Sequence, residues 1–254
     1  MSKLDKCPPP TLGFVLNLYR NLAMHRDANG WEEEYKKRGA LWIHDGNPRR
    51  PHAELASGKH SNGVFNSRIV ITDEELMWEA ASDLLQIYLS QGGDLPRFLW
   101  VIGPQTGATK LAEVLALNAE WVLRDTVLWA SPAKHEHEGE KFFVFSKSDS
   151  MLIHGHPVLL CEDVITTGGS VGLVVRALAD IGVSSATTRP FVLMLVNRSG
   201  LRSVMGKKII SLIDHPMPTW TPDECPLCKL GSEALRQPKN PANWARLNRF
   251  YFKY

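Results

Sequence analysis

Apolar runs of strand length alternate with segments of helical periodicity along most of the chain. The pattern predicts strand, glycine loop and helix over 97–117, a short strand within 125–132, a strand and helix from 158 onward, and strands within 187–200 and 208–214. This alternation is typical of βαβ units and of a mostly parallel sheet buried on both faces. Ligands bind such sheets at the carboxyl ends of the strands. We therefore expect the loops after Ile102, Trp129, Glu162-Asp163 and Val196 to gather on one edge.

The remaining segments are less regular. Helical spacing predicts helices at 12–24, at the charged stretch 31–43 and at 73–91, and turn residues divide 54–72 into strand, tight turn and strand. Residues 133–157 are polar with little helical periodicity, and the tail from His215 is rich in proline and aromatic residues. We expect an N-terminal helical extension (1–53), a main domain (54–214, with a hairpin at about 54–72 and a core at 97–214) and a C-terminal tail (215–254).

Composition narrows the class of protein. The 254 residues are 44% hydrophobic with a formal charge of +2, which suits a globular α/β protein and gives no sequence-wide case for nucleic-acid binding. No apolar stretch approaches the ~18 residues that a membrane span needs. We see no signal peptide, and four cysteines are too few for a disulfide framework. These features favour a cytoplasmic protein without a membrane or nucleic-acid partner.

The stretch VLLCEDVITTGGSV, residues 158–171, carries the strongest chemical signal. An apolar strand ends in two adjacent carboxylates, Glu162 and Asp163, and a loop of threonine, glycine and serine leads into a helix. The N–H groups of a glycine turn and the positive end of a helix dipole bind anions. Taken alone, Thr166–Ser170 could equally be an ordinary strand-to-helix turn with a hydroxyl cap.

The carboxylates make an anion site more specific. They would repel a phosphate unless they met hydroxyl groups or a divalent cation on the same ligand. The nucleotide P-loop and dinucleotide motifs are both absent. A phosphorylated sugar with bound Mg²⁺ satisfies every part of the stretch.

CEDVITTGGSV resembles the 5-phosphoribosyl-1-diphosphate (PRPP) signature of the type I phosphoribosyltransferases. Three further segments resemble the orotate phosphoribosyltransferases in consistent order: the hairpin SGKHSNGVFN (57–66), the loop and helix VIGPQTGATKLAEVLA (101–116), and NRSG (197–200). ECPLCKLG (224–231) resembles a C-terminal element of some long bacterial members. The resemblance implies an α/β fold of type I phosphoribosyltransferase architecture: a mostly parallel sheet flanked by helices, with a small N-terminal hood region.

The same resemblance implies roles for individual residues at the PRPP site. Glu162 and Asp163 would hold the ribose hydroxyls and Mg²⁺, directly or through water, and Asp163 also counts among the catalytic residues. The implied PRPP contacts beyond this pair come from three segments: Gly103, Lys59, and the loop Thr166, Thr167, Gly168, Gly169 and Ser170.

At the acceptor end, Arg198 would pair with the orotate carboxylate, which a planar guanidinium suits. Thr166 and Phe65 would lie near the base. In the polar segment after Pro132, Lys134 and His137 would act as catalytic residues of a mobile loop that, in the family, often crosses a dimer interface. Without a role in binding or catalysis, Arg198 would be a surface arginine at a strand end, and the segment with Lys134 and His137 would be a solvated charged loop.

Several cations of the family pattern are missing. Ala130-Ser131-Pro132 stands where the family's loop has an arginine, and Ala56 stands where many members have a lysine. These departures bear on the acceptor base more than on the PRPP site. Cys225-x-x-Cys228 could be half of a zinc site, but no second half is visible, so we expect a structural turn with free thiols.

The resemblance implies a homodimeric, Mg²⁺-dependent enzyme of pyrimidine nucleotide biosynthesis. It would transfer the phosphoribosyl group of PRPP to a nucleobase, with orotate favoured, and release pyrophosphate. Two alternatives remain open from the sequence. One is transfer to another nucleobase. The other is a PRPP-binding regulator on the same fold, and the absence of the loop arginine leaves this second alternative open.

Overall fold

The computed structural model describes residues 25–250, so the helix expected at 12–24 lies outside it. In chain order the elements are α2 (Ala28–Lys37), β1 (Leu41–Ile43), β2 (His52–Glu54), β3 (His60–Ser61), β4 (Gly63–Phe65), α3 (Arg68–Ile71), α4 (Glu74–Ser90), β5 (Trp100–Ile102), α5 (Thr109–Leu123), β6 (Leu128–Ala130), β7 (Ala133–His137), β8 (Glu140–Val144), α6 (Lys147–Ile153), β9 (Val158–Ile165), α7 (Gly169–Asp180), β10 (Thr188–Asn197), β11 (Ser203–Val204), β12 (Lys207–Asp214), β13 (Thr219–Trp220), α8 (Pro226–Lys229), β14 (Ala234–Arg236) and α9 (Pro241–Asn248).

A six-stranded sheet forms the core, in the order β11-β12-β10-β9-β5-β6. The strands from β12 to β6 run parallel, and only the edge strand β11 is antiparallel. The carboxyl ends of β5, β6, β9 and β10 therefore share one edge, as the sequence predicts. The fold class is confirmed: a mostly parallel α/β sheet flanked by helices.

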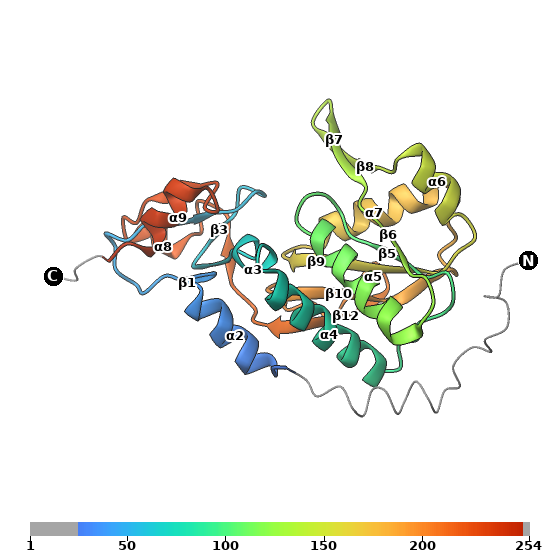
Figure 1. The fold of residues 1–254 in the computed structure, drawn as a ribbon. Coiled ribbons are helices and arrows are strands. Elements are labelled where there is room, and N and C mark those ends of the chain that lie inside the picture. Colours follow the sequence, from blue (N-terminus) through green and yellow to red (C-terminus); the bar gives the residue numbers. More distant parts are fainter. Residues whose placement is uncertain (1–24, 251–254) are drawn as a thin grey trace, which may run out of the picture.

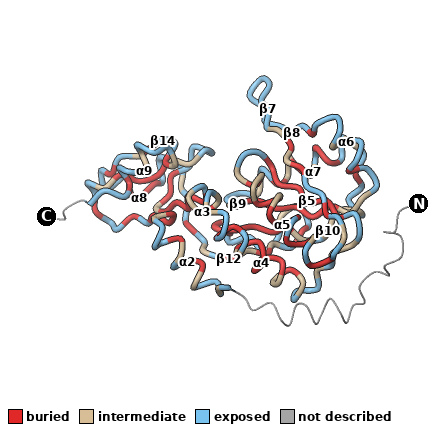
Figure 2. Tube along the Cα trace, viewed as in Figure 1, coloured by how far each residue is buried: buried red, intermediate tan, exposed pale blue. Residues whose placement is uncertain are grey.

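Side chains alternate between the two faces of this sheet because successive residues of a strand point in opposite directions. In β9, Leu159 and Cys161 pack with α4 and α5 in one hydrophobic cluster. Val158 and Leu160 pack with α7 and α6 in another. Figure 1 shows α4 and α5 on one side of the sheet and α7 on the other. The central strands β5, β9 and β10 are largely buried on both faces, which explains their continuous apolar runs (Figure 2).

A second lobe covers the edge at which the strand ends gather (Figures 1 and 2). It is a four-stranded sheet in the order β13-β3-β2-β14 with α8 and α9, and we call it the hood. The hairpin β2–β3 supplies the middle of this sheet, and strands from the C-terminal region flank it on both sides. A small core that includes Trp42, Leu235 and Leu247 fills the lobe.

The structure divides the chain differently from the expected domains. The boundary between 53 and 54 falls inside β2, and the segment from 215 onward contributes β13 and β14 to the sheet of the hairpin. The polar segment 133–157 forms the β7–β8 hairpin and α6. The described part of the chain contains no helix long and apolar enough to cross a membrane.

Candidate active site at the carboxyl ends of the sheet

Glu162 and Asp163 lie in the second half of β9, and their carboxyl groups are close enough to interact. Glu162 continues the Val158–Leu160 face toward α7, and it is buried. Its Oε1 accepts a hydrogen bond from the Asp163 N–H at 3.1 Å, whereas Oε2 is buried with no partner among the described residues. Burial, and then the nearby Asp163 carboxylate, raise the pKa of Glu162 well above its usual value. A buried orphan oxygen of this kind suits a hydroxyl donor or a cation.

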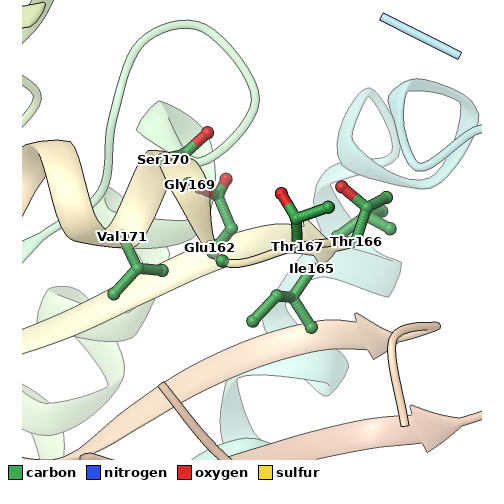
Figure 3. Close-up of a pocket in the computed structure, with 9 residues that line it drawn as sticks. Glu162, Ile165, Thr166, Thr167, Gly169, Ser170 and Val171 are labelled. Carbon is green, nitrogen blue, oxygen red and sulfur yellow. The ribbon is translucent and has the colours of Figure 1, made fainter. Parts of the chain in front are cut away.

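The loop after β9 forms a small pocket of about 50 Å³. Glu162 lines it together with the loop from Thr166 to Ser170. Figure 3 shows the hydroxyl groups of Thr167 and Ser170 turned to the same side as the Glu162 carboxylate. Gly168 caps α7 with a left-handed φ of 81°, a conformation that favours glycine, and the first N–H groups of α7 open onto the loop. The pocket has the size and the donors for one phosphate group.

The glycine loop between β5 and α5 approaches the acidic pair closely. A Cβ on Gly107 would lie 2.7 Å from Oδ1 of Asp163, and a Cβ on Gly103 would lie 2.4 Å from the carbonyl oxygen of Ala108. Only glycine fits at these two positions without displacing its neighbours. The loop backbone therefore lies directly beside the Asp163 carboxylate, as a pyrophosphate-binding loop next to a ribose site requires.

A larger cavity of about 690 Å³ opens between the core sheet and the hood. The carboxyl ends of β9 and β10 form one wall, and the hairpin β2–β3 with the segment after β14 forms the other. Its charged lining residues are Arg68, Arg198, Arg236, Lys239, Glu54 and Asp163. Thr166 lines both this cavity and the small pocket, so one extended ligand can occupy the two. Four cations against two carboxylates suit an anionic ligand.

Arg198 and Phe65 lie in this cavity, as the sequence predicts. Arg198 is buried, and its guanidinium donates to the Gly63 carbonyl at 3.0 Å and to the Ser61 hydroxyl at 2.7 Å. Burial lowers its pKa to about 10, which leaves it charged at neutral pH. Within residues 25–250 no carboxylate pairs with it. A buried cation without a counter-ion is a strong attractor for an anionic ligand.

Arg236 and Lys239 are cavity residues that the sequence analysis missed. Arg236 ends β14 and Lys239 follows it, and Arg236 Nε lies 3.6 Å from Oε1 of Glu54 on the neighbouring strand β2. Lys239 is partly buried; burial lowers its pKa, whereas the nearby Asp163 carboxylate raises it. Because β14 pairs with β2, both residues line the cavity. Nothing in the sequence near residue 239 signals this role.

Three predicted site residues lie away from the cavity. Lys59 is exposed in the β2–β3 turn and does not line it. Lys134 and His137 are exposed on β7, in the hairpin that projects from the body of the molecule in Figure 1. Because side chains alternate along a strand, Lys134 and His137 point to opposite faces of this ribbon. Neither of them reaches the pockets of its own chain in this conformation.

Comparison with known proteins decides the family. Residues 71–225 match the phosphoribosyl transferase domain. The chain is 30% identical over 189 residues to the orotate phosphoribosyltransferase of Heliobacterium modesticaldum, covering 73% of this chain and 87% of that protein. The chain belongs to the orotate phosphoribosyltransferases. The enzyme of Caldicellulosiruptor bescii is 31% identical over 182 residues, covering 71% of this chain and 84% of that protein.

The crystal structure of orotate phosphoribosyltransferase from Aeropyrum pernix has the same fold. It aligns with a TM-score of 0.50 and 26% sequence identity, covering 72% of this chain and 92% of that one. The family match ends at residue 225, so the part of the hood that supplies Arg236 and Lys239 lies beyond it. Membership in the orotate phosphoribosyltransferases confirms the resemblance seen in the sequence.

Proposed function

We propose that this protein transfers the 5-phosphoribosyl group of PRPP to orotate, forming orotidine 5′-phosphate and releasing pyrophosphate. One observation carries the proposal. A phosphate-sized pocket and a basic cavity meet at Thr166, with the Glu162–Asp163 pair between them. PRPP has the same order of groups: a 5-phosphate, ribose hydroxyls and a diphosphate beside the reacting carbon.

PRPP binds with its 5-phosphate in the loop Thr166–Ser170 and its ribose hydroxyls on Glu162 and Asp163. The diphosphate then lies along the Gly103–Gly107 backbone, near the ammonium group of Lys239. The reaction breaks the bond between the ribose C1 and the diphosphate oxygen and forms a bond from C1 to the orotate nitrogen. Positioning and stabilisation of the leaving diphosphate supply the catalysis, and no covalent nucleophile is needed.

Orotate binds in the larger cavity against Arg198. Two guanidinium donors of Arg198 are occupied by Gly63 and Ser61, and this fixes the plane of the group. Its remaining N–H donors can meet the orotate carboxylate, with Phe65 beside the ring. Arg198 should therefore favour orotate over neutral bases, because a neutral base would leave the buried guanidinium without a counter-ion.

Magnesium fits the acidic pair. The orphan Oε2 of Glu162 and the Asp163 carboxylate offer hard oxygen ligands, directly or through water. Bound Mg²⁺ would neutralise negative charge on the diphosphate. The carboxylates themselves orient the ribose and keep it beside the glycine loop.

The β7–β8 hairpin suits a homodimer in which each hairpin completes the site of the partner. Lys134 and His137 are exposed and remote from their own cavity, yet a family member needs catalytic groups over the diphosphate. Measuring the mass in solution tests the dimer directly. At an orotate concentration well below the raised KM of Arg198→Ala, mixing Lys134→Ala protein with Arg198→Ala protein should give more activity than the two proteins give separately, because hybrid dimers contain one intact site. Mixtures no more active than the separate proteins would contradict hairpin exchange.

We also propose a cytoplasmic location, where the three free thiols of the described residues would stay reduced.

A turnover assay tests the function. The purified protein is mixed with PRPP and Mg²⁺. Orotate, uracil, hypoxanthine and adenine are then added in separate reactions, and the release of pyrophosphate is measured in each. We expect release with orotate alone and none without Mg²⁺. Release with another base would assign a different acceptor, and PRPP binding without turnover would indicate a regulator on this fold.

A further inference from the structure

Four potential metal ligands meet inside the hood, away from the cavity residues described above. They are His52 on β2, His60 on β3, and Cys225 and Cys228 at the start of and within α8. Their ligand atoms all lie within 4.8 Å of one another. His52, His60 and Cys225 are buried, and Cys228 is partly exposed. The expectation of a structural turn with free thiols is based on the lack of a visible second half of a zinc site in the sequence. The two histidines that supply this half stand more than 160 residues from the cysteines.

Four of the six distances among these atoms lie close to the edge lengths of a zinc tetrahedron. With Zn–N bonds of ~2.0–2.1 Å and Zn–S bonds of ~2.3 Å, tetrahedral angles place two nitrogens ~3.3 Å apart and a nitrogen and a sulfur ~3.6 Å apart. Here His52 Nε2 lies 3.1 Å from His60 Nδ1. It lies 3.6 Å from Cys225 Sγ and 3.5 Å from Cys228 Sγ, and His60 Nδ1 lies 3.2 Å from Cys228 Sγ.

A neighbouring hydroxyl fixes the tautomer of His52. The Ser232 hydroxyl lies 2.6 Å from the Arg50 carbonyl oxygen, which can only accept, so Ser232 donates its proton there. The Ser232 oxygen must then accept from His52 Nδ1–H, at 2.9 Å. His52 Nε2 is left with a free lone pair directed at the other three ligand atoms. Metal-bound histidines are oriented by a partner on the second ring nitrogen in the same way.

The chemistry of the four ligands selects zinc. Two thiolates and two imidazoles in a tetrahedron are typical of structural zinc sites, and four protein ligands leave no open position for catalysis. The thiols are unbridged, so both sulfurs remain available. His215, which stands nearer to the cysteines in sequence, contacts Glu32 at 2.9 Å and takes no part.

We propose that the hood binds one structural Zn²⁺ through His52, His60, Cys225 and Cys228. The ion joins the β2–β3 hairpin to the C-terminal segment, two parts of the chain that otherwise meet through short strands. The segment after this junction carries Arg236 and Lys239 into the cavity. The zinc site therefore holds one wall of the cavity in place.

Metal content of the purified protein tests the proposal. We expect one zinc per chain by inductively coupled plasma mass spectrometry after purification without metal-affinity steps. Cys228→Ser and His60→Ala should lose the metal. Two matched variants should retain it: Cys161→Ala, which removes a buried thiol of the core, and His215→Gln, which removes the other nearby histidine.

Cobalt spectroscopy of the wild-type protein tests the metal site without the ligand variants, in which misfolding alone would also cause loss of the metal. Zinc is exchanged for Co²⁺ in the wild-type protein, and the visible spectrum is recorded. We expect the strong d–d bands of tetrahedral cobalt and a thiolate-to-cobalt charge-transfer band, with both lost on adding Zn²⁺. Absence of zinc together with absence of these bands would overturn the proposal and leave a hydrogen-bonded thiol–imidazole cluster. Equal loss of zinc in Cys161→Ala would also overturn it.

Discussion

Replacing Glu162 with glutamine should stabilise the ligand-free protein and weaken its binding of PRPP. The Glu162 side chain is buried beside Asp163, and its Oε2 has no partner among the described residues. Burial raises its pKa, so the folded state must either keep a proton on this group or bury a charge. A glutamine can donate from its amide to the Asp163 carboxylate at every pH, and its oxygen can still accept from the Asp163 N–H.

The size of the gain follows from the burial. Leaving a buried polar group unsatisfied costs ~1–3 kcal/mol. For a chain of this length each kcal/mol shifts the melting temperature by ~2–4 °C, so Glu162→Gln should gain ~2–12 °C at neutral pH or above. PRPP would lose a hydrogen bond to a charged group, worth ~1.5–3 kcal/mol, which corresponds to a loss of ~10- to 150-fold in kcat/KM.

The pH dependence gives the sign of the effect. A carboxyl whose pKa is raised on folding binds more protons in the folded state, so its contribution to stability is present below the unfolded pKa and is lost as pH rises through the folded pKa. The glutamine carries no such dependence. The difference in melting temperature between variant and wild type should therefore grow as pH rises above ~4.5 and then level off.

Differential scanning fluorimetry from pH 5 to pH 9 measures this difference, and steady-state kinetics at pH 8 measure the loss for PRPP. Glu136→Gln, at an exposed position in the projecting hairpin, is the matched control and should show no pH-dependent gain. Two results would refute the conclusion that Glu162 is a buried carboxyl group without a partner in the ligand-free protein. One is a variant no more stable than wild type, and the other is a difference in melting temperature that does not change with pH.

Three further substitutions separate the parts of the site. Arg198→Ala should raise the KM for orotate ~10- to 100-fold while changing the KM for PRPP little, and equal loss for both substrates in steady-state kinetics would remove the orotate assignment. Lys239→Met should lower kcat/KM for PRPP ~10- to 100-fold without changing the KM for orotate; unchanged kinetics would place this lysine outside the reaction. Gly107→Ala should lower kcat/KM ~100-fold because its Cβ would lie 2.7 Å from Asp163 Oδ1, whereas Gly172→Ala, whose Cβ would meet Met205 Sδ at 3.6 Å, should retain activity.

The core of the fold and the candidate PRPP site were predictable because their signals are local. The run from Val158 to Val171 contains its own strand, its carboxylates and its loop, so the acidic pair and the phosphate pocket could be placed without knowing the rest of the chain. The period of the apolar positions predicted a parallel sheet, and the parallel order then predicted that the strand ends meet. The polar segment after Pro132 gave no such signal, and it forms a projecting hairpin that only the structure revealed.

The hood shows what sequence reasoning could not reach. The hairpin and the C-terminal segment, taken as separate regions in the sequence, share one sheet, because β14 pairs with β2 and β13 with β3. This pairing places Arg236 and Lys239 in the cavity, and brings His52 and His60 to Cys225 and Cys228. The amino-acid sequence alone determined the class of fold and the PRPP chemistry, since residues close in the chain carry both. Only the tertiary structure decided which distant side chains complete the acceptor cavity and the proposed zinc site, because those contacts depend on pairings between strands that lie far apart in the chain.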